Sequence, residues 1–493
     1  MSKRSQAFNN FYKSLSEQDA AKVDSYLRMY REHLDMDGRE ERLILHDAKA
    51  ALMYLAGSGV SVDEASQRLS SSNLGGFYAH QAQSWYPLDD AAKIYPLSMK
   101  FGKMPIFRLS CYLNEDVAPE ILQMALNFTI KRFPSFATIV RKGVFWHYLD
   151  SVKRRFPIMP DKGIPCQPLK ITAVGAQSFK VLYYKNRIST EFFHVLTDGT
   201  GGMVFLKALV GEYLHLLGAP QTFDINTPAP INELSNDFER LCPNTKEKAG
   251  LAGPAALQMS GKLSKQTPCK VIQLVYDTDK LLELTHKMGV TVTSFMLALM
   301  FMANRSATEI SKGKIQIQVP VNMRKFLPQS TTVRNFAMYC SIDLPPEEVD
   351  DVARVAQEAA KQLKQKATFE ELSKMMTQAR KLVRALRLVP MAIKSPVAKI
   401  VYGFLGDSRF SNTLSNLGVV KVPEELKPYI QGFDFVLGTC VVSRASCSMV
   451  SYGENTTLSI SKITKDPSFE ERIIALSRQL GLDPQVTETS IYE

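Results

Sequence analysis

A histidine followed by an aspartate and a glycine, in the run His194-Val-Leu-Thr-Asp198-Gly199, is the part of the sequence best suited to chemistry. Imidazole has an unperturbed pKa of about 6.5, so a histidine can take up a proton near neutral pH. We expect Asp198 to fix the turn by pairing with an arginine, and Gly199 to supply a backbone conformation that a side chain would forbid. The run predicts a general base at His194; the alternative is a loop histidine with a structural part only.

The residues before this run predict the sheet that must position it. Residues 179–184 and 188–194 are rich in β-forming residues, and the short connection through Asn186-Arg187 favours an antiparallel hairpin. His194 then stands at the end of a strand, where a rigid sheet can hold the ring while the following glycine-rich loop leaves it accessible.

The rest of the chain mixes strands and helices without strict alternation, which is typical of an α+β fold. A long helical stretch is predicted at 349–405, and a final helix from Pro467. The apolar helix 295–303 is expected to be capped by Thr293. Other helices are predicted at 119–130 and 281–287, and strands at 105–113, 143–149, 271–276, 315–319, 433–442, 446–452 and 456–462.

Two segments suggest how the chain is divided. Residues 1–80 carry apolar groups at helical spacing and no catalytic constellation, which predicts a helical extension that packs on the main body or binds a partner. Residues 243–268 are rich in Lys, Gly, Ala, Ser and Pro without periodicity, which is typical of a crossover between lobes.

Composition excludes several classes of protein. Among the 493 residues, 60 Lys and Arg against 49 Asp and Glu give a net charge of +11, which suits an anionic ligand or surface but falls short of a nucleic-acid-binding signature. The 7 cysteines are odd in number and widely spaced, which argues against a disulfide framework and a zinc knuckle. We expect no metal, because metal-ligand spacing is absent around His46, His80, His215 and His286.

The 194–199 run resembles the catalytic motif of the CoA-dependent acyltransferase superfamily, which includes chloramphenicol acetyltransferase and the condensation domains of peptide synthetases. Val319-Pro-Val-Asn-Met-Arg324 resembles the family's Pro-Val-x-x-Arg segment, and residues 334–342 follow it as the next family strand does. Ser415-Asn416-Leu417-Gly418 resembles a Ser-Asn-x-x-Gly turn. Condensation domains usually have a second histidine where this chain has Phe193, so the resemblance is closest to the bacterial alcohol acetyltransferase-like branch.

This resemblance implies two chloramphenicol-acetyltransferase-like lobes, 81–260 with the motif and 261–493, with a channel between them and the helical extension 1–80 in front. His194 would be the general base and Asp198 would form a structural salt bridge with Arg324. Asn416 or Thr200 would stabilise the oxyanion or line the channel, although both also suit ordinary turn residues. Acyl-CoA, in the first place acetyl-CoA, is implied as co-substrate without a bound cofactor, and a small alcohol as acceptor.

The sequence also leaves two other functions open. One is an O-acyltransferase that uses an acyl carrier protein as donor or a lipid-like acceptor, and another is a catalytically inactive binding protein on the same scaffold. The N-terminus has no apolar signal region and no apolar run reaches about 20 residues, so we expect a cytoplasmic protein without a transmembrane segment or a nucleic-acid partner. Residues 373–394 alternate basic and apolar groups, which suits peripheral contact with anionic lipid, guidance of an anionic CoA tail, or a solvated helix face.

Overall fold

The computed structural model describes residues 3–36, 38–75, 84–90, 92–93, 95–98, 104–170, 176–227, 229–241, 254–309, 313–394, 407–439 and 443–489. Several predictions concern positions outside these ranges, so they stay predictions. They include residues 243–253 of the crossover expected at 243–268 and the end of the helical stretch expected at 349–405.

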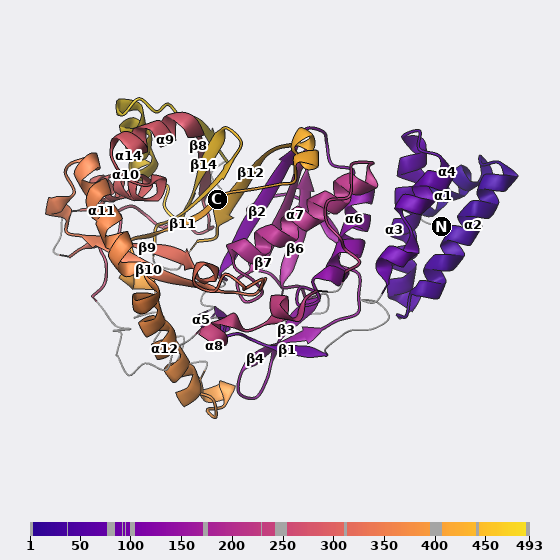
Figure 1. Ribbon diagram of the computed structural model, residues 1–493, viewed down its shortest axis with the longest axis horizontal. Coiled ribbons are helices and arrows are strands. Elements are labelled where there is room, and N and C mark those ends of the chain that lie inside the picture. The colour runs from indigo at the N-terminus through magenta and orange to yellow at the C-terminus, as the bar shows by residue number, and fades with distance from the viewer. Residues whose placement is uncertain are drawn as a thin grey trace.

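The expected helical extension is present at the N-terminus. It consists of α1(Lys3–Lys13), α2(Glu17–His33), α3(Gly38–Gly57) and α4(Val62–Arg68), followed by the 3-10 turn η1(Ser71–Leu74). Ser16 and Ser61 cap α2 and α4 by accepting backbone N–H bonds, which helps to start each helix. The helices lie beyond α6(Pro119–Thr129), on the side facing away from the second lobe (Figure 1). Their apolar stripes join the same hydrophobic core as the first sheet, so the extension packs as part of that lobe.

The first sheet carries the His194 motif. In the described part of the chain its strands run in the order β12-β2-β7-β6-β5. The bounds are β2(Ile106–Leu113), β5(Ile158–Pro160), β6(Phe179–Tyr184), β7(Arg187–Phe193) and β12(Ile430–Leu437). β6 and β7 pair antiparallel through Lys185 and Asn186, as the predicted hairpin requires. Helix α7(Gly199–Leu216), which contacts β2 and β7, follows directly after the motif.

The second sheet forms the other lobe. Over the described residues its order is β10-β9-β11-β13-β14-β8-β15, with helices packed against it. Its strands are β8(Lys270–Asp277), β9(Ile315–Asn322), β10(Ala337–Leu344), β11(Asn412–Val419), β13(Ala445–Tyr452), β14(Asn455–Lys462) and β15(Gln485–Glu488). Its helices are α9(Thr278–Lys287), α10(Val292–Ala307), α11(Val352–Lys366), α12(Phe369–Ala385) and α14(Ser468–Gln479).

Three details of the predicted elements are wrong. The cap of α10 is Thr291, whose side chain accepts the Ser294 N–H, whereas Thr293 lies inside the helix. The helical stretch from 349 is divided into α11 and α12, because Thr368 caps a new helix. The strand expected at 143–149 begins only at His147; residues 143–146 form the turn between β3(Thr138–Lys142) and β4(His147–Ser151), which pair in a small sheet with β1(Trp85–Pro87).

β12 connects the two lobes. It comes late in the sequence, yet it pairs antiparallel with β2 of the first sheet and also contacts β13 and β14. Residues from Val420 to Val436 accordingly belong to the first core. The fold is mixed α+β, as predicted, and the return of this strand means that a single boundary at 260 does not separate the two cores.

The described helices also bear on membrane insertion. Among them, no single helix is long and apolar enough to cross a membrane; α9 and α10 together satisfy the same test by length and composition, with a bend of 85° between them.

Candidate active site

His194 directly follows β7, and rings hold it from two sides. Its backbone N–H donates to the Pro105 carbonyl oxygen at 2.9 Å, which ties the end of β7 to the start of β2. The Tyr95 ring stacks on the imidazole with centroids 4.7 Å apart and planes at 22°, and Phe107 meets it edge-on at 5.2 Å. The side chain is half-buried, so the ring is fixed in orientation without being sealed in the core.

Asn335, from the second lobe, supplies the polar contact of His194. Its Nδ2 donates to the His194 carbonyl oxygen at 3.1 Å and lies 3.2 Å from Nδ1 of the imidazole. Asn335 lies just before β10, in the segment that follows Arg324. The imidazole is therefore held by groups from both lobes.

The pKa of His194 lies below its ordinary value of 6.5. Burial lowers the pKa because it penalises the charged imidazolium; the charge of Asp198 and a hydrogen bond from the ring to the residue's own carbonyl raise it, but do not outweigh burial. The imidazole is thus mostly neutral at pH 7, the protonation state that a general base requires.

Asp198 caps helix α7 and is buried. Its Oδ1 accepts the Gly201 N–H at 2.9 Å, and its Oδ2 accepts the Phe336 N–H at 2.7 Å and Nη1 of Arg324 at 2.8 Å. Burial alone would raise the pKa of Asp198, but Arg324 and these hydrogen bonds lower it below 3.8. The carboxylate is ionised and its acceptor sites are used by the protein, which suits a structural ion pair and not a second base.

Arg324 ties this carboxylate to the second lobe. It lies in the 3-10 turn η4(Met323–Phe326) after β9. Its Nε donates to the Thr332 carbonyl at 3.0 Å and its Nη2 to the Arg334 carbonyl at 2.8 Å. The pairing expected from the Pro-Val-x-x-Arg resemblance is therefore the geometry found.

Residues 332–336, which we call the hub segment, contact both sides of the motif. Besides the bonds of Arg324, the Val333 carbonyl accepts the Thr197 hydroxyl at 2.6 Å and the Phe336 N–H reaches Asp198. The Arg334 guanidinium donates to the Pro87 carbonyl and lies 3.7 Å from Asp89. Burial raises the pKa of Asp89 to about 6 despite this cation.

The glycines of the motif are required by space. Gly199 has no left-handed φ, so the expectation that its conformation would forbid a side chain is wrong; a Cβ there would come within 2.7 Å of the Leu417 side chain. At Gly201 a Cβ would overlap the Val333 carbonyl oxygen and the Thr197 hydroxyl. The absence of a side chain at both positions allows the start of α7 to pack closely against the second lobe.

Thr200 and Asn416 form hydrogen bonds elsewhere. The Thr200 hydroxyl accepts Nδ2 of Asn322 at 3.3 Å. Asn416 donates to the Thr293 hydroxyl at 3.0 Å and accepts the Gly418 N–H at 2.7 Å. The second of these bonds closes a local turn, as expected if Asn416 is an ordinary turn residue. Their part in oxyanion stabilisation stays a prediction.

Sequence reasoning missed Tyr95 and Asn335 as neighbours of His194. Asn335 lies in the segment 334–342 that resembles a family strand, but nothing in the type of either residue marks it as a contact of the imidazole. Asn335 is 141 residues from His194, so only the folded chain reveals the contact.

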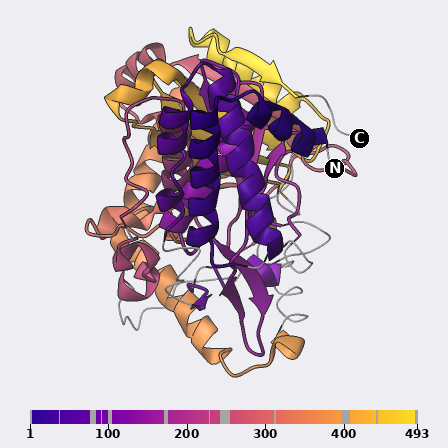
Figure 2. The same ribbon diagram turned by 90° about the vertical axis from the view of Figure 1, so that its right-hand side faces the viewer.

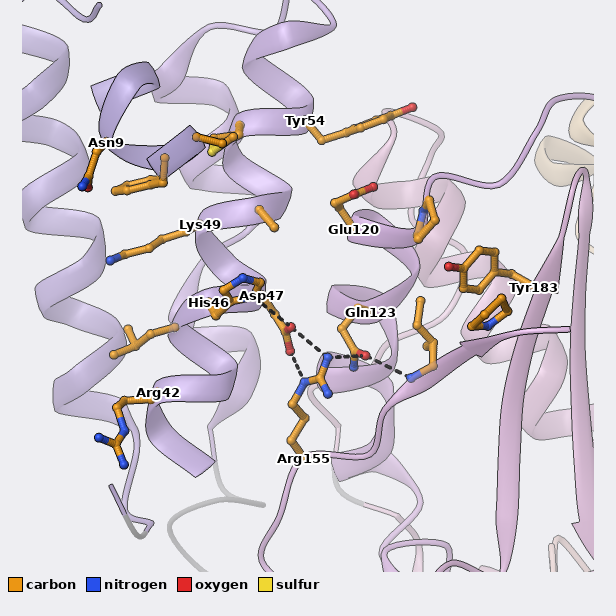
Figure 3. A pocket seen from close by; sticks show the side chains of 18 of the residues that line it. Asn9, Arg42, His46, Asp47, Lys49, Tyr54, Glu120, Gln123, Arg155 and Tyr183 are labelled. Atoms are coloured by element: carbon orange, nitrogen blue, oxygen red, sulfur yellow. Dashed lines mark hydrogen bonds and ion pairs between the residues drawn. The ribbon is translucent and has the colours of Figure 1, made fainter. Parts of the chain in front are cut away.

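A cavity of about 720 Å³ lies beside the helical extension. It is lined by residues of α1, α2, α3, α6, β5 and β6, with Arg155 between them. Figure 3 shows Asp47, Arg155 and Gln123 pointing toward one another across the gap between α3 and α6. Arg155 Nη2 is 2.9 Å from Asp47 Oδ1 and 2.7 Å from Gln123 Oε1. His194 does not line this cavity, so the predicted channel between the lobes stays a prediction.

Within the described ranges, no group of three or more His, Cys, Asp or Glu side chains is arranged to hold a metal ion.

Comparison with known proteins identifies the fold. Residues 263–472 match the model of the alcohol acetyltransferase family. TRI101 of Fusarium sporotrichioides, solved with coenzyme A and T-2, is 13% identical and superposes with a TM-score of 0.54 over 82% of this chain and 100% of its own. Polyketide synthase associated protein 5 of Mycobacterium tuberculosis is 13% identical, with a TM-score of 0.52 over 79% of this chain and 96% of its own.

The starter condensation domain of rhizomide synthetase, solved with C8-CoA and Leu-SNAC, is 13% identical, with a TM-score of 0.51 over 80% of this chain and 93% of its own. No curated protein sequence matches the chain. The resemblance to CoA-dependent acyltransferases is thus confirmed, by the fold and by the family match over 263–472.

Proposed function

With residues 263–472 matching the alcohol acetyltransferase family, we propose that the protein transfers an acyl group, in the first place acetyl, from acyl-CoA to an alcohol, with His194 as general base. The observation that carries the proposal is the placement of the imidazole at the end of β7, held between two rings and by Asn335 while Asp198 is committed to Arg324. A base with a lowered pKa beside an occupied carboxylate fits proton abstraction from a hydroxyl.

The two ring nitrogens have different surroundings. Nδ1 lies 3.2 Å from Nδ2 of Asn335, so we assign proton uptake to Nε2, the other ring nitrogen. The acceptor hydroxyl would give its proton to Nε2 as its oxygen attacks the thioester carbonyl. The tetrahedral intermediate would then collapse with cleavage of the C–S bond, and His194 would return the proton to the leaving CoA thiolate.

Direct attack needs no acyl-enzyme. The described cysteines Cys111, Cys166, Cys269, Cys340 and Cys447 are buried, and burial raises the pKa of each thiol, which disfavours the nucleophilic thiolate. A single base that serves both half-steps is the simpler mechanism for this site.

Three of the comparisons support acyl-CoA as the donor. The family match covers alcohol acetyltransferases, and two of the similar structures were solved with coenzyme A or an acyl-CoA. For this chain the donor and the alcohol acceptor belong to the proposal.

A thiol-release assay tests this function. Purified protein is mixed with acetyl-CoA and longer acyl-CoA donors and a panel of primary, secondary and phenolic alcohols, and both free CoA thiol and ester are measured. We expect acceptor-dependent thiol release matched by equal ester. If the acyl group is transferred from a loaded acyl carrier protein but not from acyl-CoA, the donor is the carrier protein. If it is transferred from neither, the proposed function is rejected.

A further inference from the structure

The end of the molecule formed by the β3–β4 hairpin and α12 carries an exposed surface that contains none of the residues assigned to the candidate active site. Figures 1 and 2 both show the hairpin turn and the end of α12 together at the bottom of the molecule. We define the apolar tip as residues 143–146 of the hairpin turn and 386–394 beyond α12. We propose that the apolar tip docks the protein on an anionic lipid bilayer.

The two segments of the tip are fastened to each other. The Met391 N–H donates to the Val144 carbonyl at 2.8 Å, and Lys394 Nζ donates to the Phe145 carbonyl at 2.7 Å. The same ammonium lies 3.4 Å from the centre of the Trp146 ring. Met391 and Lys394 are buried, so these contacts form the inside of the tip and orient its outer residues.

The outer residues of the tip are apolar and exposed. Val144 and Leu388 are each 70% exposed, Ile393 is 62% exposed and Phe145 is 41% exposed. Single exposed apolar residues are ordinary, but four on two joined segments form a patch that water disfavours. The apolar groups project from a turn and from a helix end, a shape that can enter the boundary between lipid headgroups and acyl chains.

The surroundings of the tip are basic. Residues 141–147 and 372–394 contain no Asp or Glu, and they contribute Lys142 and Arg384 next to the tip and Arg387 within it. Among the described residues, no hydrogen bond or ion pair engages the side chains of these three. A collar of unpaired cations around projecting apolar side chains complements an anionic membrane, which offers negative headgroups above an apolar interior.

This charge pattern favours lipid over a second copy of the chain. Two copies that met through the tip would bring like charges together, which opposes association. A bilayer satisfies the apolar groups and the cations at once.

Vesicle sedimentation tests the proposal with the full-length protein. We expect binding to vesicles of phosphatidylcholine with phosphatidylglycerol, weak binding to phosphatidylcholine alone, and loss of binding at high salt. V144E together with L388E should weaken partitioning by about tenfold or more, because apolar burial is lost. R384E and R387E should each weaken it by about fivefold.

Matched controls separate docking from folding and from catalysis. L282E places the same charge on an exposed apolar position of α9, at the other end of the second lobe, and should bind vesicles like the parent (Figure 1). H194A should also bind like the parent, since docking does not depend on the proposed function. Circular dichroism of each variant shows whether it is folded, so that weaker vesicle binding caused by unfolding is not taken for loss of docking.

Trp146 gives a direct readout of insertion. The chain has 2 tryptophans, so the W85F variant leaves Trp146 in the tip as the only indole. We expect its emission to shift to shorter wavelength on anionic vesicles. Absence of vesicle binding, binding unaffected by V144E with L388E, or tip variants that alter only the oligomeric state in light scattering would each overturn the proposal.

Discussion

His194 owes its proposed chemistry to neighbours that arrive from three parts of the chain. Tyr95 and Phe107 fix the plane of the ring, and Asn335 donates to the His194 backbone carbonyl and lies beside Nδ1 of the ring. Asp198 lies nearby but is committed to Arg324, so it influences His194 by its charge and not by proton transfer. The different protonation states of His194, which is neutral, and Asp198, which is ionised, are therefore set by their surroundings.

The pH dependence of turnover is a prediction at this scale. The pKa of His194 is lowered below 6.5 by burial, and a base acts only when it is neutral. We expect kcat to fall on the acid side with a midpoint below about 6.5 and to be level near pH 7. N335D, which puts a negative charge beside the ring, should move this midpoint upward. A midpoint above 7 in the parent protein would contradict the assignment.

The ion pair of Asp198 and Arg324 is a second prediction at this scale. Removing one partner leaves a buried charge unpaired, so D198N and R324Q should each lower the free energy of unfolding by about 3–5 kcal/mol. Urea unfolding of the single and double variants gives a double-mutant cycle. Because the pKa of Asp198 is lowered in the folded state, the stability that ionised Asp198 contributes is fully present above about pH 4 and is lost as the pH falls. Strictly additive effects would refute the pair.

At the scale of elements, the start of α7 and the hub segment form one contact between the lobes. Asp198 caps the helix, and Gly199 and Gly201 allow it to approach Leu417 and Val333 closely. β9 delivers Arg324 to the same place. The motif is thus an inter-lobe junction as well as a candidate active site.

Gly201 tests this close approach. A Cβ at this position would overlap the Val333 backbone oxygen, which cannot rotate away, and the Thr197 hydroxyl, so G201A should cost about 1–3 kcal/mol or more in unfolding free energy. G57A is the matched control, because nothing lies within 4 Å of a Cβ at the end of α3. Equal stability of the two variants in urea would show that the helix start is not tightly packed.

Local pattern predicted the elements around His194 well. The β6–β7 hairpin, α6, α9 and the strands β13 and β14 follow from spacing, proline position and alternation. The cap of α10 was misplaced by two residues because Thr291 and Thr293 have the same side chain, and only the backbone decides which one ends the extended segment.

Long-range contacts were beyond such patterns. β12 pairs with β2 across the sequence, and Asn335 meets His194 from the other lobe; neither contact leaves a periodic signal in the chain. The Asp198–Arg324 pair was accessible only through the motif resemblance. Gly199 was expected for its backbone angle, whereas its neighbour Leu417 supplies the reason, and that neighbour is known only from the fold.

At the scale of the whole molecule, the helical extension is joined to the first lobe by a buried polar cluster. Asp47 of α3 accepts from Arg155 and from Asn127 of α6, and Arg155 also reaches Gln123. The extension therefore shares both a core and an ion pair with the lobe that carries His194. This makes it part of the folded body, next to the cavity of Figure 3.

Arg155 tests that connection. R155A leaves Asp47 buried without its cation and should lower the free energy of unfolding by about 3–5 kcal/mol. K153A removes a neighbouring but exposed pair with Asp35, at 3.0 Å, and should cost about 0–1 kcal/mol. If urea unfolding gives equal losses for the two variants, the extension does not depend on the Asp47 cluster.

The most direct test of the central claim is the turnover of H194A with the acyl-CoA and alcohol pair that the parent uses best. A general base contributes about 10²–10⁴-fold to rate, so we expect a loss of that size with an unchanged fold. H147A, a half-buried histidine on β4, should keep turnover close to the parent. Turnover of H194A within a few fold of the parent would contradict His194 as the catalytic base.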